Sequence, residues 1–300
     1  QIIQDITFLR EDSKGKKDLI AKKVQPISLK EEELDDETTT VPFTARLMAY
    51  QRAQESKRDS PLLIDPFAER LAGDLTKYLK KHVRYSEMEY PLVRCYHIEE
   101  QLLTPWCKKY VKSQIVLLGA GLDTRAYRFK PFQSNTHILF EVDFPNVIHY
   151  KESILEDKQP LCRLVRISVD LSDPDWTSYL MNSGFSSDIP TFWVLEGLVY
   201  YMEQRVVASL LANTAEISVE NSEIFVDLFH ASRWVSFPTI INGLVTGFAK
   251  HFKWGLDIKL APSFFATTGW KVSCAFADEY DQGRNVGQKA MIFVHGIRAT

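Results

Sequence analysis

Short apolar runs recur along the chain from residue 113 onward. The first run, residues 115–118, carries no polar side chain and ends at Gly119, which is typical of a strand buried on both faces. Similar runs follow at residues 137–142, 164–169, 191–195, 223–229, 271–276 and 290–295, most of them separated by segments long enough to hold a helix. This alternation predicts the α/β class, with a doubly wound, mainly parallel seven-stranded sheet and a ligand crevice at the carboxyl ends of its strands.

Three stretches with helical character precede the first strand, at residues 43–57, 65–82 and 86–112. The second begins with a strong start signal, because Asp65 can cap the helix, Pro66 suits its first position and Glu69 completes a capping-box-like pattern. We therefore expect a helical cap over residues 41–112 and an α/β core over residues 113–300, within a single domain spanning residues 41–300.

The first forty residues differ in composition from the rest of the chain. They are charged and poor in aromatic side chains, with Lys14, Lys16 and Lys17 followed by a cluster of acidic residues. Such a segment usually stays solvated, so residues 1–40 are predicted to form a flexible or loosely packed arm, with a docking tail as the alternative.

Composition excludes several classes of partner. The formal net charge is only -3, with acidic and basic residues interspersed, so neither nucleic acid nor an anionic membrane is predicted as a partner. The four cysteines lie far apart without metal-ligand spacing, and no metal site is predicted. No apolar run reaches the roughly 20 residues of a membrane span and no signal-peptide pattern is present, which favours a cytoplasmic location.

The strongest local motif is I-V-L-L-G-A-G-L-D-T-R, which covers residues 115–125. Gly119 and Gly121 permit a tight turn and let the backbone approach a ligand closely. Thr124 stands where the dinucleotide fingerprint has its third glycine, a departure that disfavours NAD and suits a nucleoside ligand without phosphates. The alternative is that the glycines serve only a strand-to-helix turn.

Carboxylates occur at the ends of the next three strands. Glu141 and Asp143 follow the glycine turn by about 20 residues, the spacing at which a carboxylate accepts hydrogen bonds from ribose hydroxyls. Asp170 and Leu171 end the third strand, where they could contact a base, although Asp170 is as well suited to cap a helix. Glu196 interrupts an apolar strand, so we expect it to pair with a polar or cationic group in the crevice.

These motifs, taken in order, resemble those of the leucine carboxyl methyltransferase family, which are S-adenosylmethionine-dependent O-methyltransferases. The matching segments read L-L-G-A-G-L-D-T-R, F-E-V-D-F-P, V-D-L-S-D and L-E-G-L-V-Y-Y-M, with an upstream arginine in Y-P-L-V-R, and the likeness covers roughly residues 41–299. The resemblance implies a Rossmann-like class I methyltransferase core and S-adenosyl-L-methionine as cofactor, with S-adenosyl-L-homocysteine as product.

The resemblance also implies roles for individual residues. Arg94 would hold the methionine carboxylate of the cofactor, Gly119 and Gly121 would form its binding turn, and Asp143 would accept from its ribose hydroxyls.

Further roles concern the adenine, the methionine moiety and the acceptor. Asp170 and Leu171 would contact adenine, and Glu196 would lie near the methionine amino group. Arg46 falls where eukaryotic members carry a basic residue at the active site, whereas bacterial members often lack one.

Methyl transfer from a sulfonium needs alignment of the acceptor rather than a nucleophilic side chain. A carboxylate acceptor, on a small molecule or a protein C-terminus, is already ionised near neutral pH and needs only a clamp. Arg46 and Tyr201 are the predicted positioning residues, with Arg52 and Tyr200 as further candidates. The aromatic-rich segment 232–260, an insertion between the fifth and sixth strands, is predicted to form a helical lid over the acceptor, with an additional core layer as the alternative.

Two other functions share parts of this pattern. A nicotinamide-dependent oxidoreductase would also use a glycine turn and an acidic strand tip. A catalytically silent relative could bind the cofactor, or nothing, and act as an interaction module through its charged arm.

Overall fold

The computed structural model describes residues 8–11, 17–20, 41–75, 89–133, 136–233, 252–286 and 289–299 of the chain. The chain divides into two compact units, residues 1–34 and 35–300. In the first unit, β1 (Phe8–Glu11) pairs antiparallel with β2 (Lys17–Ile20), a hairpin that the sequence pattern did not predict. That residues 1–40 act as an arm stays a prediction.

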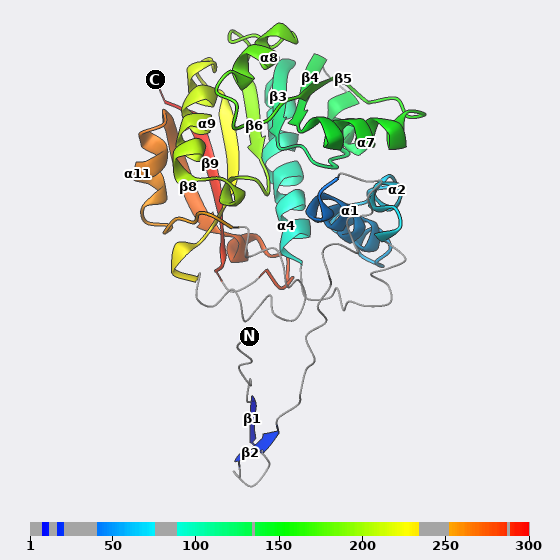
Figure 1. Cartoon of the computed structure of the whole chain (residues 1–300), viewed down its shortest axis with the longest axis vertical. Coiled ribbons are helices and arrows are strands. Elements are labelled where there is room, and N and C mark those ends of the chain that lie inside the picture. The colour runs from blue at the N-terminus through cyan, green and yellow to red at the C-terminus, as the bar shows by residue number, and fades with distance from the viewer. Residues whose placement is uncertain are drawn as a thin grey trace. The chain divides into compact units, whose positions relative to one another are not determined.

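The second unit is built on a seven-stranded sheet within the described residues, in the order β5-β4-β3-β6-β7-β9-β8 (Figure 1). Its strands are β3 (Lys112–Leu118), β4 (Thr136–Asp143), β5 (Arg163–Ser168), β6 (Thr191–Leu195), β7 (Glu223–Phe229), β8 (Trp270–Phe276) and β9 (Met291–Arg298). Neighbouring strands from β5 to β7 are parallel, and β9 is antiparallel to both β7 and β8. The predicted α/β, doubly wound, mainly parallel sheet is confirmed.

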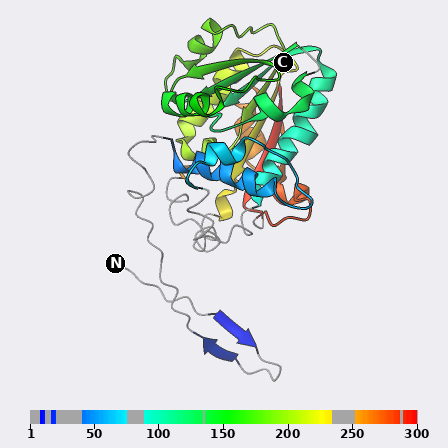
Figure 2. The same ribbon diagram turned by 90° about the vertical axis from the view of Figure 1, so that its right-hand side faces the viewer.

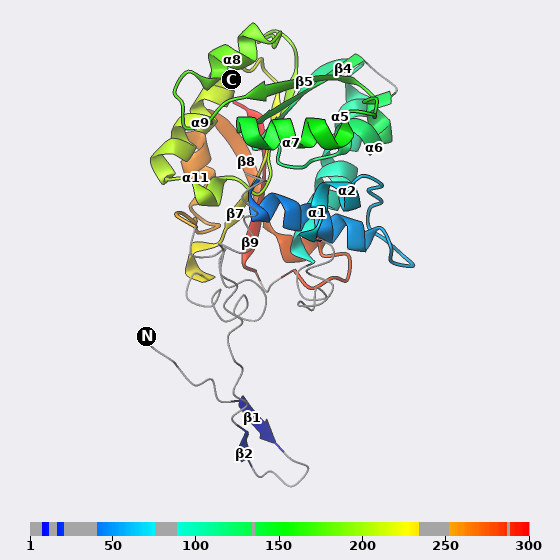
Figure 3. The same ribbon diagram turned by 45° about the vertical axis from the view of Figure 1, so that its right-hand side comes forward.

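Both faces of the sheet are buried because its central strands alternate between two apolar cores. Ile115 and Leu117 of β3 face one core, while Val116 and Leu118 face the other. The first core also contains side chains of α7 (Pro145–Leu155), which crosses β4 and β5 in Figure 3. The second contains side chains of α8 (Trp176–Asn182), α9 (Gln204–Glu216) and α11 (Ala261–Ala266). Helices on both sides of the sheet therefore explain its unbroken apolar runs.

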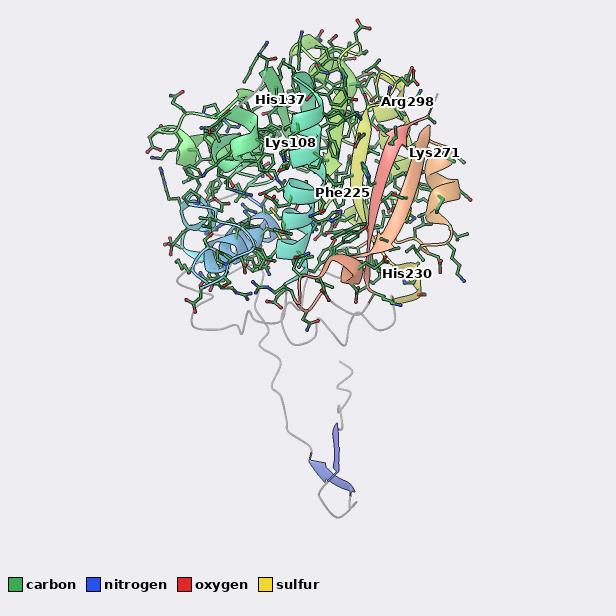
Figure 4. The ribbon with its side chains drawn as sticks, turned by 180° about the vertical axis from the view of Figure 1, so that it is seen from behind. Lys108, His137, Phe225, His230, Lys271 and Arg298 are labelled. Atoms are coloured by element: carbon green, nitrogen blue, oxygen red, sulfur yellow. The ribbon has the colours of Figure 1, made fainter. Side chains whose placement is uncertain are left out.

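A continuous helical segment covers the first face of the sheet between residues 90 and 109. It comprises α4 (Tyr90–Tyr96), the π-helical η3 (His97–Leu103) and α5 (Thr104–Lys109). The ring of His97 packs against Phe225 of β7 with 6.0 Å between centroids, and Figure 4 labels Phe225 beside this helix. The predicted helix over residues 86–112 is confirmed for residues 90–109, whereas Lys112 already belongs to β3.

The remaining cap elements are α1 (Phe43–Glu55) and α2 (Ala68–Ala72), drawn in blue in Figure 2. α2 ends where Gly73 adopts a φ of 58°, so the prediction of one helix over residues 65–82 is wrong. The Asp65 carboxylate does accept from the Phe67 amide at 3.0 Å, but it lies three positions before the first residue of α2. Residues 76–88 lie outside the described part of the chain.

Short helical turns complete the described structure: α6 (Arg125–Arg128), η4 (Lys130–Gln133), η5 (Val199–Tyr201), η6 (Ala231–Arg233) and η8 (Ala277–Tyr280). Most of the predicted lid, residues 234–251, lies outside the described residues. None of the described helices has the length and apolar character required to cross a bilayer.

A buried ion triad joins β4, α7 and β5. The Glu141 carboxylate lies 3.0 Å from Nζ of Lys151 and 2.9 Å from Nε of Arg166, and the side chains of Glu141 and Lys151 are both fully buried. Glu141 therefore holds the sheet to α7, and it is not among the residues that line the cavity described below.

Replacing Glu141 tests this structural role. Glu141→Gln would leave the Lys151 ammonium buried without its charge partner, so we expect the free energy of unfolding to fall by about 3 kcal/mol. Urea denaturation measures the change. Glu152→Gln, which removes an exposed partner of the same Arg166, should shift stability by no more than about 0.5 kcal/mol. Equal effects of the two substitutions would contradict the assignment.

Candidate functional site

A cavity of about 340 Å³ opens at the carboxyl ends of β3, β4 and β6. Small-molecule sites typically lie in this size range and at this edge of a parallel sheet. The helical cap forms the opposite wall through α1 and α4, and the segment before β9 contributes Asn285, Val286 and Ala290. A cavity therefore lies where the sequence predicted a crevice, and the helical cap forms part of its wall.

The glycine turn after β3 forms one side of the cavity. Gly119 and Gly121 have φ angles of 68° and 49°, a region that residues with a Cβ rarely adopt. A Cβ at Gly119 would also come within 2.8 Å of the Leu198 side chain. Substitution at Gly119 would therefore distort the turn and its packing together.

Asp143 faces this turn from the end of β4. Its Oδ2 accepts from the Gly121 amide at 2.6 Å and its Oδ1 from the Phe144 amide at 2.7 Å. Burial raises the pKa of the Asp143 carboxyl, although the two amide hydrogen bonds oppose that rise. The carboxylate is thus fixed in orientation, and it lines the cavity.

Arg94 reaches the cavity from α4 and is held by two carboxylates. Its Nε donates to Glu196 at 3.0 Å, and its Nη1 donates to Asp227 at 2.7 Å. Nη2 makes no hydrogen bond to another described residue. A planar guanidinium presents a fork of donors, so Nη2 remains available to an anionic ligand group.

Glu196 bridges two arginines at the end of β6. Its Oε2 accepts from Nη1 of Arg125 at 2.9 Å, while its Oε1 accepts from Arg94. Burial alone would raise the pKa of Glu196, but Arg125 and Arg94 outweigh it and hold the pKa below its usual range. The expectation that Glu196 pairs with cationic groups in the crevice agrees with this geometry.

Two functional residues were missed by the sequence analysis. Asp227 of β7 is fully buried and accepts from Tyr90 Oη at 2.6 Å, from Arg94, and from the Gly197 amide at 2.6 Å. A lone carboxylate in the apolar run E-I-F-V-D-L-F is the signal that identified Glu196, and it would have identified Asp227 as well. Arg125, also missed, is the last residue of the glycine motif, to which the sequence analysis gave no role.

The helical cap contacts the glycine turn through a further set of charges. Arg125 Nε donates to Glu99 at 3.0 Å, and both terminal nitrogens of Arg128 donate to the same carboxylate at 2.8 and 2.6 Å. Burial would raise the pKa of Glu99, but Arg128 and Arg125 together hold it below its usual range. α4 through η3 and the segment after the turn are therefore joined by paired charges.

Three predicted site residues do not line the cavity. Asp170 is exposed and its carboxylate accepts from the Ser172 amide at 2.8 Å, while Leu171 is buried. Arg46 donates from Nε and Nη2 to the Ala72 carbonyl at 3.4 and 3.3 Å, at the end of α2. The other predicted residues, Arg94, Gly119, Gly121, Asp143, Glu196 and Tyr201, are brought together around one cavity.

Aromatic rings form another part of the cavity wall. Tyr200, Tyr201 and Phe252 pack mutually with ring centroids 4.5 to 5.1 Å apart, and all three line the cavity. Burial raises the pKa of Tyr201 to about 12. Phe252 is the described part of the predicted lid that lines the cavity, whereas Trp254 packs in the second core.

Among the described residues, no group of three His, Cys, Asp or Glu side chains is arranged to hold a metal ion. The cations around the cavity are instead arginines, each paired with carboxylates of the protein.

The strand order and the cavity define the class I methyltransferase fold. Solved structures with this fold include a "putative methyltransferase" from Thermobifida fusca YX, with a TM-score of 0.54 and 15% identity, covering 91% of this chain and 100% of that one. A DUF574 family protein from Streptomyces avermitilis MA-4680 has a TM-score of 0.58 and 12% identity, covering 85% of this chain and 97% of that one. At such low identities the likeness establishes the fold alone.

The family itself is identified by sequence. The model of the leucine carboxyl methyltransferase family matches residues 45–215. Two relatives are named "Putative S-adenosyl-L-methionine-dependent methyltransferase". The one from Saccharopolyspora erythraea is 29% identical over 75% of this chain and 78% of its own length. The one from Mycobacterium tuberculosis is 31% identical over 64% of this chain and 67% of its own length. The chain belongs to the leucine carboxyl methyltransferase family, within the S-adenosylmethionine-dependent methyltransferases.

The charge network predicts how stability depends on pH. Because the pKa of Glu99 is lowered on folding, its contribution is complete above the unfolded-state pKa of about 4.3 and is lost as the pH falls through the lower folded-state value. Glu99→Gln should therefore flatten the acid side of the stability profile by up to about 1.4 kcal/mol per pH unit.

Urea denaturation between pH 3 and 7 measures this slope. Glu100→Gln, which changes the exposed neighbouring carboxylate, should retain the wild-type slope. An unchanged slope in Glu99→Gln would show that its pKa is not lowered by folding.

Proposed function

We propose that this protein transfers a methyl group from S-adenosylmethionine to a carboxylate oxygen, producing a methyl ester. One observation carries the choice of acceptor: the described residues that line the cavity include neither histidine nor lysine, and each of its carboxylates is already engaged. Asp123 and Glu196 are paired with arginines, and Asp143 accepts from two backbone amides and is proposed to bind the ribose. No described group is thus placed as an uncommitted general base. A carboxylate acceptor needs none, because it is already ionised near neutral pH.

The residues around the cavity suit the proposed cofactor. Nη2 of Arg94 is a donor for the methionine carboxylate, and the remaining lone pairs of Asp143 can accept from the ribose hydroxyls. Room for a ligand against the turn lies beside Gly121, where an added Cβ would meet no atom within 4 Å. Glu196 would lie near the methionine amino group. When bound, the cofactor supplies an electrophilic methyl group on its sulfonium.

Asp170 and Leu171 are proposed to contact the adenine. Support comes from the backbone, since the Val169 amide donates to the Asp143 carbonyl at 3.0 Å and so sets the following two residues beside the proposed ribose site. Phe144, which is 47% exposed and lines the cavity, provides an apolar surface at the same strand tip.

Tyr200 and Tyr201 are proposed to orient the acceptor. Burial raises the pKa of both phenols, that of Tyr201 to about 12, so each stays protonated near neutral pH and acts as a hydrogen-bond donor rather than as a base. Donors suit a carboxylate oxygen. Arg46 was the other predicted positioning residue, but its contact with Ala72 does not favour that role.

The apolar side chains that line the rest of the cavity indicate what kind of group the acceptor carries next to its carboxylate. Those contributed by α1, its preceding residue and the segment leading into β9 are Pro42, Ala45, Met48, Val286, Ala290 and Met291. Such a lining favours an acceptor that carries an apolar group next to its carboxylate, whether on a small molecule or at a protein C-terminus.

The two alternative functions have less support. A nicotinamide-dependent oxidoreductase would need a third glycine close to the pyrophosphate, whereas Thr124 is fully buried and its hydroxyl donates to Asp65 at 2.7 Å. A catalytically silent module that binds nothing would have no use for this cavity, whereas one that binds the cofactor would share it and is distinguished by the methyl-transfer screen below.

Asp143→Asn tests the cofactor site. Loss of a charged hydrogen-bond acceptor should weaken binding of S-adenosylmethionine and S-adenosylhomocysteine by more than about 1 kcal/mol, measured by titration calorimetry. Asp157→Asn changes an exposed carboxylate and should leave both affinities unchanged. Wild-type protein that binds NAD and neither adenosyl compound would refute the proposed cofactor.

A labelled-methyl transfer screen tests the acceptor class. Carboxylic acids with apolar bodies should be methylated to products that release the label in base, whereas phenols should remain unmodified. Tyr201→Phe should lower kcat for the best acid about tenfold, with the affinity for S-adenosylmethionine unchanged, because only the orienting donor is lost. Base-stable ethers as the main products would overturn the carboxylate assignment.

A further inference from the structure

The glycine turn is held from outside the core by a second pair of charged residues, Arg52 of α1 and Asp65 of the segment before α2. Nη2 of Arg52 donates to the Leu122 carbonyl at 2.6 Å, and its Nε donates to Oδ2 of Asp65 at 2.8 Å. The same Oδ2 accepts from the Thr124 hydroxyl at 2.7 Å. Two points of the turn, a carbonyl and a hydroxyl, are therefore bound to one ion pair of the helical cap.

Both members of the pair are shielded from water. The Asp65 side chain is fully buried and that of Arg52 is 13% exposed. Burial would raise the pKa of Asp65, but Arg52 and Arg128 outweigh it and hold the pKa below its usual range. Charged hydrogen bonds in such surroundings are stronger and more directional than those at the surface.

The pair also gives Thr124 a function. A threonine hydroxyl can donate one hydrogen bond and accept others, and that of Thr124 donates to Asp65 while accepting from Nε of Arg128 at 2.8 Å. Glycine at this position could do neither. The residue that distinguishes this turn from a dinucleotide-binding turn is thus one of the two, with Leu122, through which this ion pair holds it.

Arg52 reaches the turn without entering the acceptor wall described above. Arg52 lines the cavity, and its guanidinium donates to the Asp65 carboxylate and the Leu122 carbonyl, both of them protein acceptors. A group placed in this way acts on a ligand through the shape of the turn.

We propose that Arg52 and Asp65 are positioning residues for the cofactor: together they fix the turn at residues 119–124 in its binding conformation before the cofactor arrives. This inference rests on the cofactor site proposed above and adds two residues that lie outside the strand-end motifs. A turn that is already ordered loses little conformational freedom on binding, so removing the pair should weaken affinity for the cofactor without altering acceptor recognition.

The experiment compares Arg52→Gln, Asp65→Asn and the double variant with wild-type protein. Titration calorimetry should show Kd values for S-adenosylmethionine and S-adenosylhomocysteine raised about tenfold in each single variant. Because the two residues act as one pair, the double variant should resemble the single ones rather than show a hundredfold change. KM for the acceptor should stay within about twofold of wild type.

A readout in the cofactor-free protein separates positioning from general destabilisation. Amide hydrogen exchange at residues 119–124 should accelerate in the variants, while exchange in β3 and β6 stays as in wild type. Lys57→Gln is the matched control, since it removes an exposed ion pair with Glu69 between the same two regions of the cap. It should change neither the exchange nor the affinity.

Arg52→Lys covers the case in which the neutral variants do not fold. A lysine keeps the charge beside Asp65 but has a single ammonium group and no guanidinium fork, so its affinity should fall between those of wild type and Arg52→Gln. If the wild-type protein binds the cofactor, an unchanged Kd in Arg52→Lys would by itself overturn the inference, and so would an unchanged Kd in Asp65→Asn. Failure of the wild-type protein to bind either adenosyl compound would instead contradict the proposed function.

Discussion

Two buried guanidinium groups must be neutralised for this fold to have a cavity at all. Arg94 and Arg125 are both shielded from water, and Glu196 lies between them with one oxygen on each. Transferring a charge into a protein interior costs several kcal/mol unless a partner of opposite sign is held close to it. The positions of Glu196, directly after β6, and of Asp227, inside β7, meet that requirement.

From this constraint the arrangement of the site follows. Since protein carboxylates occupy Nε and Nη1 of Arg94, the guanidinium of this cavity-lining residue is fixed in orientation, and its Nη2 is bonded to no other described residue. Asp143 is fixed in the same manner by two backbone amides. Donors and acceptors held in place before a ligand arrives need little reorganisation on binding, which is the usual physical basis of affinity and of alignment for a displacement reaction. The helical cap therefore belongs to the site as much as the sheet does.

The sequence was most informative where the determining interactions are local. The largely apolar runs at residues 191–195 and 223–229 coincide with β6 and β7, since a strand buried on both faces favours apolar side chains. Glu196 was identified by the same reasoning, because a carboxylate in an apolar run must pair with a polar or cationic group when it is buried. The family resemblance and the fold, both confirmed, rest on these strand ends and the turn after β3.

Side-chain contacts between segments far apart in the sequence could not be predicted from the pattern of apolar and polar residues. Arg46 donates to the end of α2, and Arg52 donates to the glycine turn. The residues next to either arginine give no sign of these contacts, because the acceptors lie in other elements, 26 and 70 positions further along the chain. The end of α2 at Gly73 could not be predicted either. A glycine inside a helix and a glycine that ends one look alike in the sequence and differ only in φ. Asp170 shows a further ambiguity. A carboxylate that follows a strand can accept from a backbone amide of the next turn, as that of Asp170 does, or from a ligand, and the sequence looks the same in both cases.

The central claim is that one cavity, bounded by Arg94, Asp143 and the glycine turn, holds the adenosyl cofactor. A crystal structure of the full chain with S-adenosylhomocysteine tests it most directly. The account predicts the homocysteine carboxylate at Nη2 of Arg94 and the ribose hydroxyls at Asp143. A nucleoside bound elsewhere, or an Arg94 that contacts only Glu196 and Asp227 while the ligand is present, would contradict it.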